Sequence, residues 1–328
     1  MSQLSLYDLS DRLDELSAKN DPLEQLNEVI DWRCFAKLLK QIRPKAGSKG
    51  GRPSYDGILL FKMLVIASLY NLSDEQLEYQ VKDRLSFMRF LGLGLNDRVP
   101  DATTIWLFRE RLVNKGLMDK LFTRFSRYLE ESGYAASGGQ IIDASIVEVP
   151  KRRGKLEEEE EGSLPRRRQQ DADAKWTKKH GKSYFGYKNH ISIDKKNKLI
   201  RKAHVTDASV HDSQAMDQVL DADNEGMDVW ADSAYRSEET EQWLSEQGYR
   251  SRIHHRAYRN RPLKARQQQQ NNTRSKVRAR VEHVFGHQVT AMSSTIIRNI
   301  GKQRVATRIM LNNLVYNLSR YRYLISVA

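Results

Sequence analysis

Three acidic residues stand at positions that ordinary packing does not explain. Asp143 lies inside the apolar segment 140–149, and Asp232 ends the apolar segment 227–232. Glu282 follows a long basic stretch and is the last acid of the chain. An ionised carboxylate among apolar residues costs several kcal/mol unless a cation or dedicated hydrogen-bond donors compensate it. These acids are therefore candidates for binding cations.

Each acid also has a structural explanation when it is taken alone. Backbone amides could satisfy Asp143, and Asp232 could cap the helix that follows it. Glu282 could pair with Arg278, which lies four residues earlier on the same expected helix. These explanations stay open for the single residues.

Taken together, the three acids indicate phosphodiester chemistry. Two adjacent strands and a packed helix can bring carboxylates that are distant in sequence to one edge of a sheet. Converging carboxylates repel one another unless divalent cations neutralise them, and hard oxygen ligands favour Mg²⁺ or Mn²⁺. Two such ions, about 3.5–4 Å apart, activate an attacking hydroxyl and stabilise a leaving oxygen. We expect a two-metal site of Asp143, Asp232 and Glu282.

The segments around these acids predict an α/β fold with a mixed sheet flanked by helices. The turn 195–198 should join two strands into a hairpin, and Ser237 should open a helix. Val277, Val281 and Val284 form an apolar helix face that would hold Glu282 against the sheet. Strands are expected at 140–149, 184–194, 199–206, 227–232 and 249–254, and further helices at 212–220 and 238–247.

The remainder of the chain predicts a helical N-terminal region. Ser73 and Gln76 have the form of a capping box that opens a helix ending near Phe90. This region predicts either a helix-turn-helix-like DNA-binding unit or an ordinary small bundle. The expected parts are an N-terminal helical segment 1–45, a helical, DNA-binding candidate region 46–136, and a catalytic domain 137–328 with a flexible insertion at about 151–182.

The charge distribution predicts a polyanionic partner. The 328 residues carry 55 Lys and Arg against 42 Asp and Glu, a formal net charge of +13. Residues 251–281 contain ten Lys or Arg and no acid, and Tyr258 lies among them as a possible stacking surface. A solvated basic loop is the alternative, above all for 267–272. The cations that we expect to contact DNA are Arg256, Arg259, Arg274, Lys276, Arg278 and Arg280, with Lys188 from a neighbouring strand.

Composition excludes other classes of protein. The longest apolar run, 58–70, has 13 residues and includes Lys62, whereas a membrane-spanning helix needs about 20. The first residues lack the pattern of a secretory signal. The single cysteine, Cys34, can form neither an internal disulfide nor a cysteine cage for zinc. We expect a cytoplasmic protein that is associated with the nucleoid when it is bound to DNA.

Several motifs give the chain a close resemblance to bacterial DDE transposases. The resemblance is to the insertion sequence five family, within the insertion sequence four group. It covers the chain from about residue 50 to the end, with the motifs in the order of the family. The segments that carry it are 100–104 (PDATT) with 108–109 (FR), 142–145 (IDAS), 186–190 (GYKNH), 231–235 (ADSAY) and 278–286 (RARVEHVFG).

The resemblance implies an RNase H-like catalytic domain, two divalent metal ions per active site, and cutting and joining of DNA at the inverted repeats of a mobile element. Carried over by position, Asp143, Asp232 and Glu282 match the metal-binding triad. The larger group has a Tyr three residues before the Arg and a Lys seven residues after the Glu. Ser275 and Val289 occupy these places here, so the contacts of that Tyr and Lys do not transfer.

The resemblance predicts a transposase that acts on double-stranded DNA, with Mg²⁺ (Mn²⁺ as a substitute). Because two ends must be joined in one event, we expect a homodimer in the synaptic complex. Two alternatives remain open at this stage. One is an RNase H-like nuclease that cuts without joining, and the other is a catalytically inactive DNA-binding regulator derived from a transposase. The presence of all three acids speaks against the second alternative.

Overall fold

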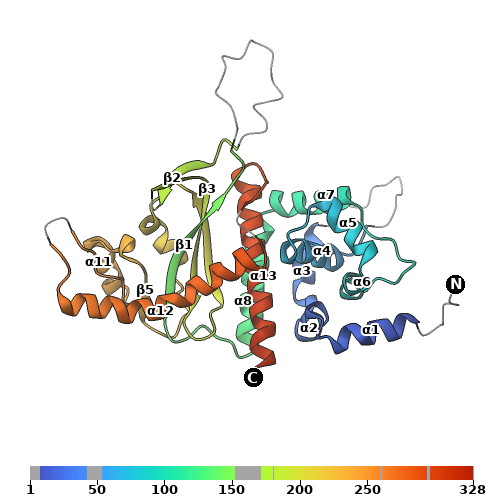
Figure 1. The fold of residues 1–328 in the computed structure, drawn as a ribbon, viewed down its shortest axis with the longest axis horizontal. Helices are drawn as coiled ribbons and strands as arrows, with labels where there is room; N and C mark the ends of the chain where they lie inside the picture. The colour runs from blue at the N-terminus through green and yellow to red at the C-terminus, as the bar shows by residue number, and fades with distance from the viewer. Residues whose placement is uncertain are drawn as a thin grey trace, which may run out of the picture. The chain divides into compact units, whose positions relative to one another are not determined.

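The computed structural model describes residues 8–42, 54–151, 171–179, 181–258, 261–293 and 296–327. Contacts divide the chain into two compact units. Met1–Tyr128 with Leu318–Ala328 form the first, which we name the helical unit, and Leu129–Asn317 form the second, the sheet unit. Figure 1 shows the elements of both. The linker expected at 45–53 and most of the insertion expected at 151–182 lie outside the described residues.

The helical unit is built around α4 (Gly57–Leu69), whose side chains are almost all buried. Asp56 caps α4 by accepting hydrogen bonds from the amides of Ile58 and Leu59. The rings of Trp32 and Phe90 lie 5.5 Å apart in an edge-to-face arrangement beside it. The other elements are α1 (Asp8–Ala18), α2 (Pro22–Val29), η1 (Trp32–Phe35), α3 (Ala36–Leu39), η2 (Lys40–Ile42), α5 (Asp74–Asp83), α6 (Leu85–Leu91), α7 (Ala102–Asn114) and α8 (Leu117–Glu131).

The capping box predicted from Ser73 and Gln76 is confirmed. Gln76 donates its amide hydrogen to the Ser73 hydroxyl at 3.2 Å, and the Gln76 side chain accepts from the Ser73 amide at 3.1 Å. The single helix expected to continue to Phe90 is wrong, because Arg84 has extended backbone angles (φ −106°, ψ 117°) that end α5 and start α6. The break lets each short helix turn its own apolar side into the core.

The sheet unit contains a mixed sheet of six strands in the order β2-β3-β1-β5-β6, with β4 also paired to β3. β1 runs antiparallel to β3 and parallel to β5, and β5 runs parallel to β6. This arrangement confirms the predicted α/β class, a mixed sheet flanked by helices. The strands are β1 (Gln140–Glu148), β2 (Lys175–Lys179), β3 (Lys182–Asp194), β4 (Ile200–Asp207), β5 (Asp228–Trp230) and β6 (Arg250–Ser251).

Two expectations for the sheet unit need correction. The segment taken as a flexible insertion contains β2, which pairs antiparallel with the start of β3. The sequence of β2 has no apolar alternation, so its pairing depends on β3. The ring of Trp176 on β2 lies 5.2 Å from the ring of Phe185 on β3. The helix expected at 212–220 is instead two short pieces, η3 (Asp212–Ala215) and α10 (Met216–Val219).

Three longer helices flank the sheet: α11 (Glu238–Glu246), α12 (Ala265–Thr290) and α13 (Lys302–Ser326). Ser237 caps α11 as expected. α12 crosses β1 (Figure 1) and buries Val281 and Val284 completely. Asn313 of α13 exchanges two hydrogen bonds with Asn189 of β3, at 2.9 and 3.0 Å. Both helices are thereby fixed to the sheet that carries the predicted acids.

Within the described residues, no single helix is long and apolar enough to cross a membrane. One bent pair, α4 with α5, meets the criteria of length and composition only.

Candidate active site

Asp143 lies in the middle of β1 with its side chain 12% exposed. Its carboxylate accepts a hydrogen bond from the Ala144 amide at 2.8 Å and another from Nη2 of Arg278 at 2.7 Å. Burial raises the pKa of Asp143, and the guanidinium and the amide only partly oppose this shift. The sheet therefore holds a carboxylate that needs positive charge beside it to remain ionised.

Arg278 supplies that charge from α12. Its Nη2 atom lies 3.6 Å from Oε1 of Glu282, one helical turn further along. Burial acts to lower the pKa of Arg278, but the carboxylates of Asp143, Asp232 and Glu282 outweigh burial and raise it. The three acids singled out in the sequence thus act on one guanidinium.

Asp232 is positioned by the end of β5, the parallel neighbour of β1. Its carboxylate accepts a hydrogen bond from the Ala234 amide at 2.8 Å and so caps η4 (Ser233–Tyr235). The structural explanation of Asp232 as a cap is therefore correct. The charge of Asp232 also acts to raise the pKa of Asp143, with a smaller effect than burial.

The residues of the site fit a divalent cation in chemistry and charge. Three carboxylates offer hard oxygen ligands, and two of them, those of Asp143 and Glu282, lie beside the guanidinium of Arg278. Glu282 has a side chain that is 64% exposed and hence free to turn. Among the residues that the structure describes, no three His, Cys, Asp or Glu side chains lie close enough together to hold one ion. Glu282 and the guanidinium would have to move for all three acids to bind a metal.

Sequence reasoning did not recognise Tyr235 as part of this site. Tyr235 is fully buried, and no described residue forms a hydrogen bond with its hydroxyl. Burial raises its pKa well above the usual value, and the charges of Asp143, Asp212 and Asp232 raise it further. The signal available in the sequence was the position of this tyrosine three residues after Asp232.

Asp212 is a fourth carboxylate near the site, and its charge acts on Tyr235. Its Oδ1 atom lies 2.8 Å from Nζ of Lys188, which also donates a hydrogen bond to the carbonyl of Val210. The side chain of Lys188, which we had expected to touch DNA, is therefore engaged within the protein and only 12% exposed. Next to it on β3, burial lowers the pKa of His190 to about 4, so His190 is neutral at pH 7.

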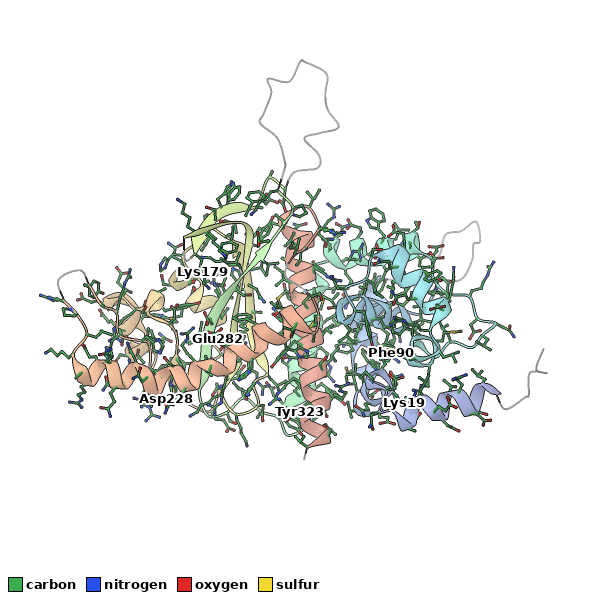
Figure 2. All side chains as sticks on the ribbon, in the orientation of Figure 1. Lys19, Phe90, Lys179, Asp228, Glu282 and Tyr323 are labelled. Carbon is green, nitrogen blue, oxygen red and sulfur yellow. The ribbon has the colours of Figure 1, made fainter. Side chains whose placement is uncertain are left out.

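The other expected DNA contacts lie along α12 and just before it. Lys276 is exposed and Arg280 is half-buried, whereas Arg274 donates a hydrogen bond to the carbonyl of Ile253. Arg256 is exposed, with its guanidinium 5.9 Å from the ring centre of Tyr258. Arg259 lies outside the described residues. Figure 2 shows Glu282 on α12, the helix that carries most of these cations.

A mixed sheet with acids at the middle of one strand, at the end of the next and on a packed helix is an arrangement found in a class of enzymes that act on phosphodiesters. Comparison with known families places the chain within that class. Residues 135–318 match the family described as Transposase DDE domain, and residues 11–111 match the one described as Transposase domain (DUF772). The chain belongs to the DDE transposases, and its function is DNA transposition, which involves DNA cleavage.

One solved structure is similar over most of the chain. It is the cryo-EM structure of the piggyBac transposase synaptic complex with hairpin DNA, at 12% sequence identity and a TM-score of 0.47. The similarity covers 93% of this chain and 76% of that one.

Proposed function

We propose that Asp143, Asp232 and Glu282 bind the divalent metal ions of the transposase. The observation that carries this proposal is the guanidinium of Arg278, whose Nη2 atom lies 2.7 Å from Asp143 and 3.6 Å from Glu282, while Asp232 follows the strand paired with that of Asp143. The acids exceed the one cation by two negative charges, a surplus that attracts divalent cations. Mg²⁺ fits the oxygen donors best, with Mn²⁺ as a substitute.

The bound ions would lower the pKa of an attacking water or 3′-hydroxyl and stabilise the leaving oxygen. The protein side chains have separate tasks. Asp143, fixed on β1 by the Ala144 amide, supplies a rigid oxygen ligand, and Asp232 is fixed by its cap. Glu282 supplies a ligand that can move. When Glu282 turns towards the sheet and the guanidinium moves away from Asp143, Arg278 becomes available to hold a phosphate of the DNA strand.

We also propose that the protein is a member of the insertion sequence five family that binds the inverted-repeat ends of its element. The motifs 142–145, 231–235 and 278–286 support this assignment. Two ends must meet in one complex, which supports a homodimer. The cations of α12, Lys276 and Arg280 among them, would bind the DNA backbone.

A DNA end carrying the inverted repeat and a label tests the proposal. The wild-type protein should cut this end and join it to target DNA in Mg²⁺, and neither product should form in EDTA. Asp143→Asn, Asp232→Asn and Glu282→Gln should each lose cleavage and joining by about 1,000-fold or more, since a metal supplies several kcal/mol of transition-state stabilisation. Asp217→Asn is the matched control, because Asp217 is an exposed acid of the same unit.

The same assay separates the two alternatives. Cleavage without a joined product in Mg²⁺ would identify a nuclease of the same fold. End binding without any cleavage by the wild-type protein would identify a regulator. Full cleavage by Asp143→Asn would overturn the assignment of the metal ligands.

A further inference from the structure

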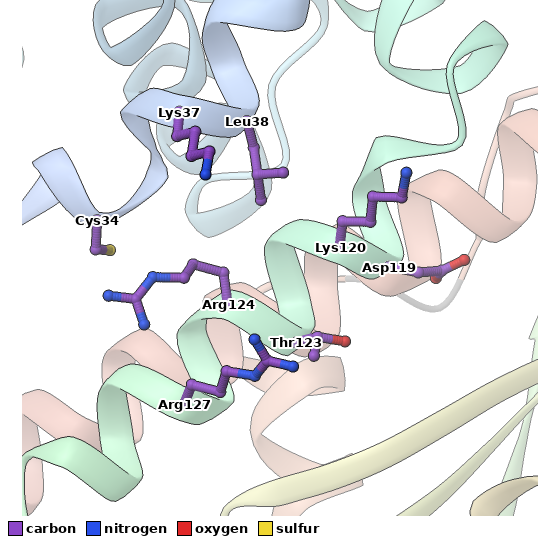
Figure 3. Close-up of a pocket in the computed structure, with 8 residues that line it drawn as sticks. All are labelled: Cys34, Lys37, Leu38, Asp119, Lys120, Thr123, Arg124 and Arg127. Atoms are coloured by element: carbon purple, nitrogen blue, oxygen red, sulfur yellow. The ribbon is translucent and has the colours of Figure 1, made fainter.

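A basic groove lies in the helical unit, whereas the three acids belong to the sheet unit. The cavity has a volume of about 510 Å³ and is lined by residues of η1, α3 and α8. We name it the α3–α8 groove. In Figure 3, Lys37 points from α3 towards α8, and Arg124 reaches from α8 towards Cys34. Its charged lining residues are Lys37, Asp119, Lys120, Arg124 and Arg127.

The amphipathic pattern of α8 creates this groove. Leu121, Phe125 and Leu129 are completely buried and hold one face of α8 in the core. Lys120, Arg124 and Arg127 follow at intervals of four and three residues, which places them in one row on the opposite face. The core therefore fixes the direction in which the three cations point.

The charges of the groove are unbalanced. Four cations line it against one carboxylate, that of Asp119. Among the described residues, no ion pair involves Lys37, Lys120 or Arg127. Other cations of the helical unit behave differently. Arg109 lies 2.6 Å from Asp74 in a pair that is mostly shielded from solvent. Arg109 is thus paired within the fold, whereas Lys37, Lys120 and Arg127 are available to an external anion.

The acidic surface of α5 strengthens this contrast. α5 lies in the region that was expected to form a helix-turn-helix-like DNA-binding unit, yet its acids outnumber its single Lys. A helix of this charge repels a DNA backbone. Within the helical unit, the groove rather than α5 has the charge that DNA requires.

We propose that the α3–α8 groove binds the phosphodiester backbone of double-stranded DNA, independently of base sequence. The proposal rests on the proposed function, because it adds a second DNA contact to the same enzyme. The row from Lys120 to Arg127 spans about 10 Å at 1.5 Å per residue. A duplex carries one charge per about 1.7 Å of its axis, so this length faces several phosphates. A single inorganic phosphate would meet only part of the row.

The salt dependence of DNA binding tests the proposal. Fluorescence anisotropy would measure the affinity of the full-length protein for a labelled duplex in EDTA, over a series of salt concentrations. Each lost phosphate contact lowers the slope of log K against log salt by about 0.9. For the triple variant Lys37→Gln, Lys120→Gln, Arg127→Gln, the magnitude of the slope should therefore be smaller than that of wild type by up to about 2.7. The decrease should be the same for duplexes of different sequence. Lys120→Gln and Arg127→Gln alone should each lose about 0.9.

A control triple variant removes the same charge from other exposed sites of the helical unit. Arg12, Lys19 and Lys82 are exposed and lie outside the groove, so their replacement by Gln should leave the slope within about 0.3 of wild type, well below one contact. An unchanged slope in the groove variants would overturn the proposal, as would an equal loss in both triple variants. Tighter binding of an RNA duplex of the same sequence, lost in the groove triple variant, would instead assign the groove to RNA.

The single cysteine of the chain gives a second measurement. Cys34 is partly exposed and lines the groove, so DNA in the groove should slow its reaction with a thiol reagent. Equal reaction rates with and without DNA would contradict the proposal. Both measurements are made without metal, so they can fail while metal-dependent cleavage is intact. Conversely, absent cleavage would leave both readouts unaffected.

Discussion

Two buried pairs of arginine and aspartate in the sheet unit have opposite characters. Arg201 and Asp194 lie 3.0 Å apart, and their side chains are 3% and 0% exposed. Arg278 and Asp143 lie 2.7 Å apart, with side chains 17% and 12% exposed. The first pair joins neighbouring parts of one hairpin, and the second joins a strand to a helix that is distant in sequence.

The carboxylate of the first pair is saturated by its surroundings, although Nη1 of Arg201 has no hydrogen-bond partner among the described residues. Asp194 also accepts from the amides of Asn197 and Leu199, and Arg201 donates to the carbonyl of Tyr134. The second pair has a surplus of acid, since Asp232 and Glu282 act on the same guanidinium. One arginine with one well-bonded carboxylate stabilises a fold. One arginine with three carboxylates leaves negative charge for another cation, which is the character of a binding site.

The largest effect on stability is expected from breaking the pair of Arg201 and Asp194. Asp194→Ala leaves the guanidinium of Arg201 buried without its partner, which should lower the free energy of unfolding by about 3–5 kcal/mol. Urea denaturation of the purified protein measures the change. A loss below about 1 kcal/mol would show that this pair contributes no more to stability than an exposed ion pair does.

Metal binding should distinguish the two pairs next. Mg²⁺ at 100 times its Kd should raise the free energy of unfolding of the wild-type protein by about 2.7 kcal/mol, because it binds only the folded state. Asp143→Asn should lose most of this gain. In the presence of Mg²⁺, the control Asp217→Asn should gain as much as wild type. Equal stabilisation of Asp143→Asn and wild type would place the ion elsewhere.

The pH dependence of stability should sharpen the contrast further, with a smaller effect. Because burial raises the pKa of Asp143, its ionised form disfavours folding at neutral pH. Metal-free Asp143→Asn should therefore be at least as stable as wild type at pH 7. The advantage should shrink as the pH falls towards about 3.9, where the unfolded chain also binds the proton. Denaturation at pH 7, 5.5 and 4.5 measures it, and an advantage that grows on acidification would contradict the assigned direction.

The smallest effect is expected for Tyr235→Phe. The buried hydroxyl of Tyr235 finds no acceptor among the described residues, so its removal should change stability by less than about 1 kcal/mol or increase it. If the hydroxyl binds a carboxylate or water only when metal and DNA are present, the variant should nevertheless lose activity. Unfolding and cleavage measured on the same preparation separate the two effects. A loss of stability of about 2 kcal/mol would reveal a hydrogen bond in the folded protein that the structure does not show.

Local features of the sequence predicted the structure best. The hairpin of β3 and β4 follows from two apolar runs around a short turn, and the capping box of Ser73 follows from a spacing of three residues. β2 could not be predicted, because its pairing depends on β3 rather than on its own composition. The break at Arg84 was missed for a related reason, since packing overrides a continuous helical pattern.

The candidate site was predicted to a similar degree. Burial in apolar segments singled out Asp143 and Asp232, and isolation in a basic stretch singled out Glu282. The contact of Arg278 with Asp143 joins residues that no spacing rule connects, so only the fold could show it. The hydroxyl of Tyr235 is conspicuous only because it is buried without a partner, which is a property of the folded chain.

α12 carries Arg274 and Lys276 near its middle and Glu282 towards its end, without interruption. A helix of this length measures about 39 Å and behaves as a rod at such short spacings. If DNA binds Lys276 as proposed, a displacement of α12 by the DNA would also displace the carboxylate of Glu282. One residue inserted between Lys276 and Glu282 would rotate the carboxylate of Glu282 by about 100° around the helix axis relative to Lys276. Such a variant should keep DNA binding by α12 and lose DNA cleavage.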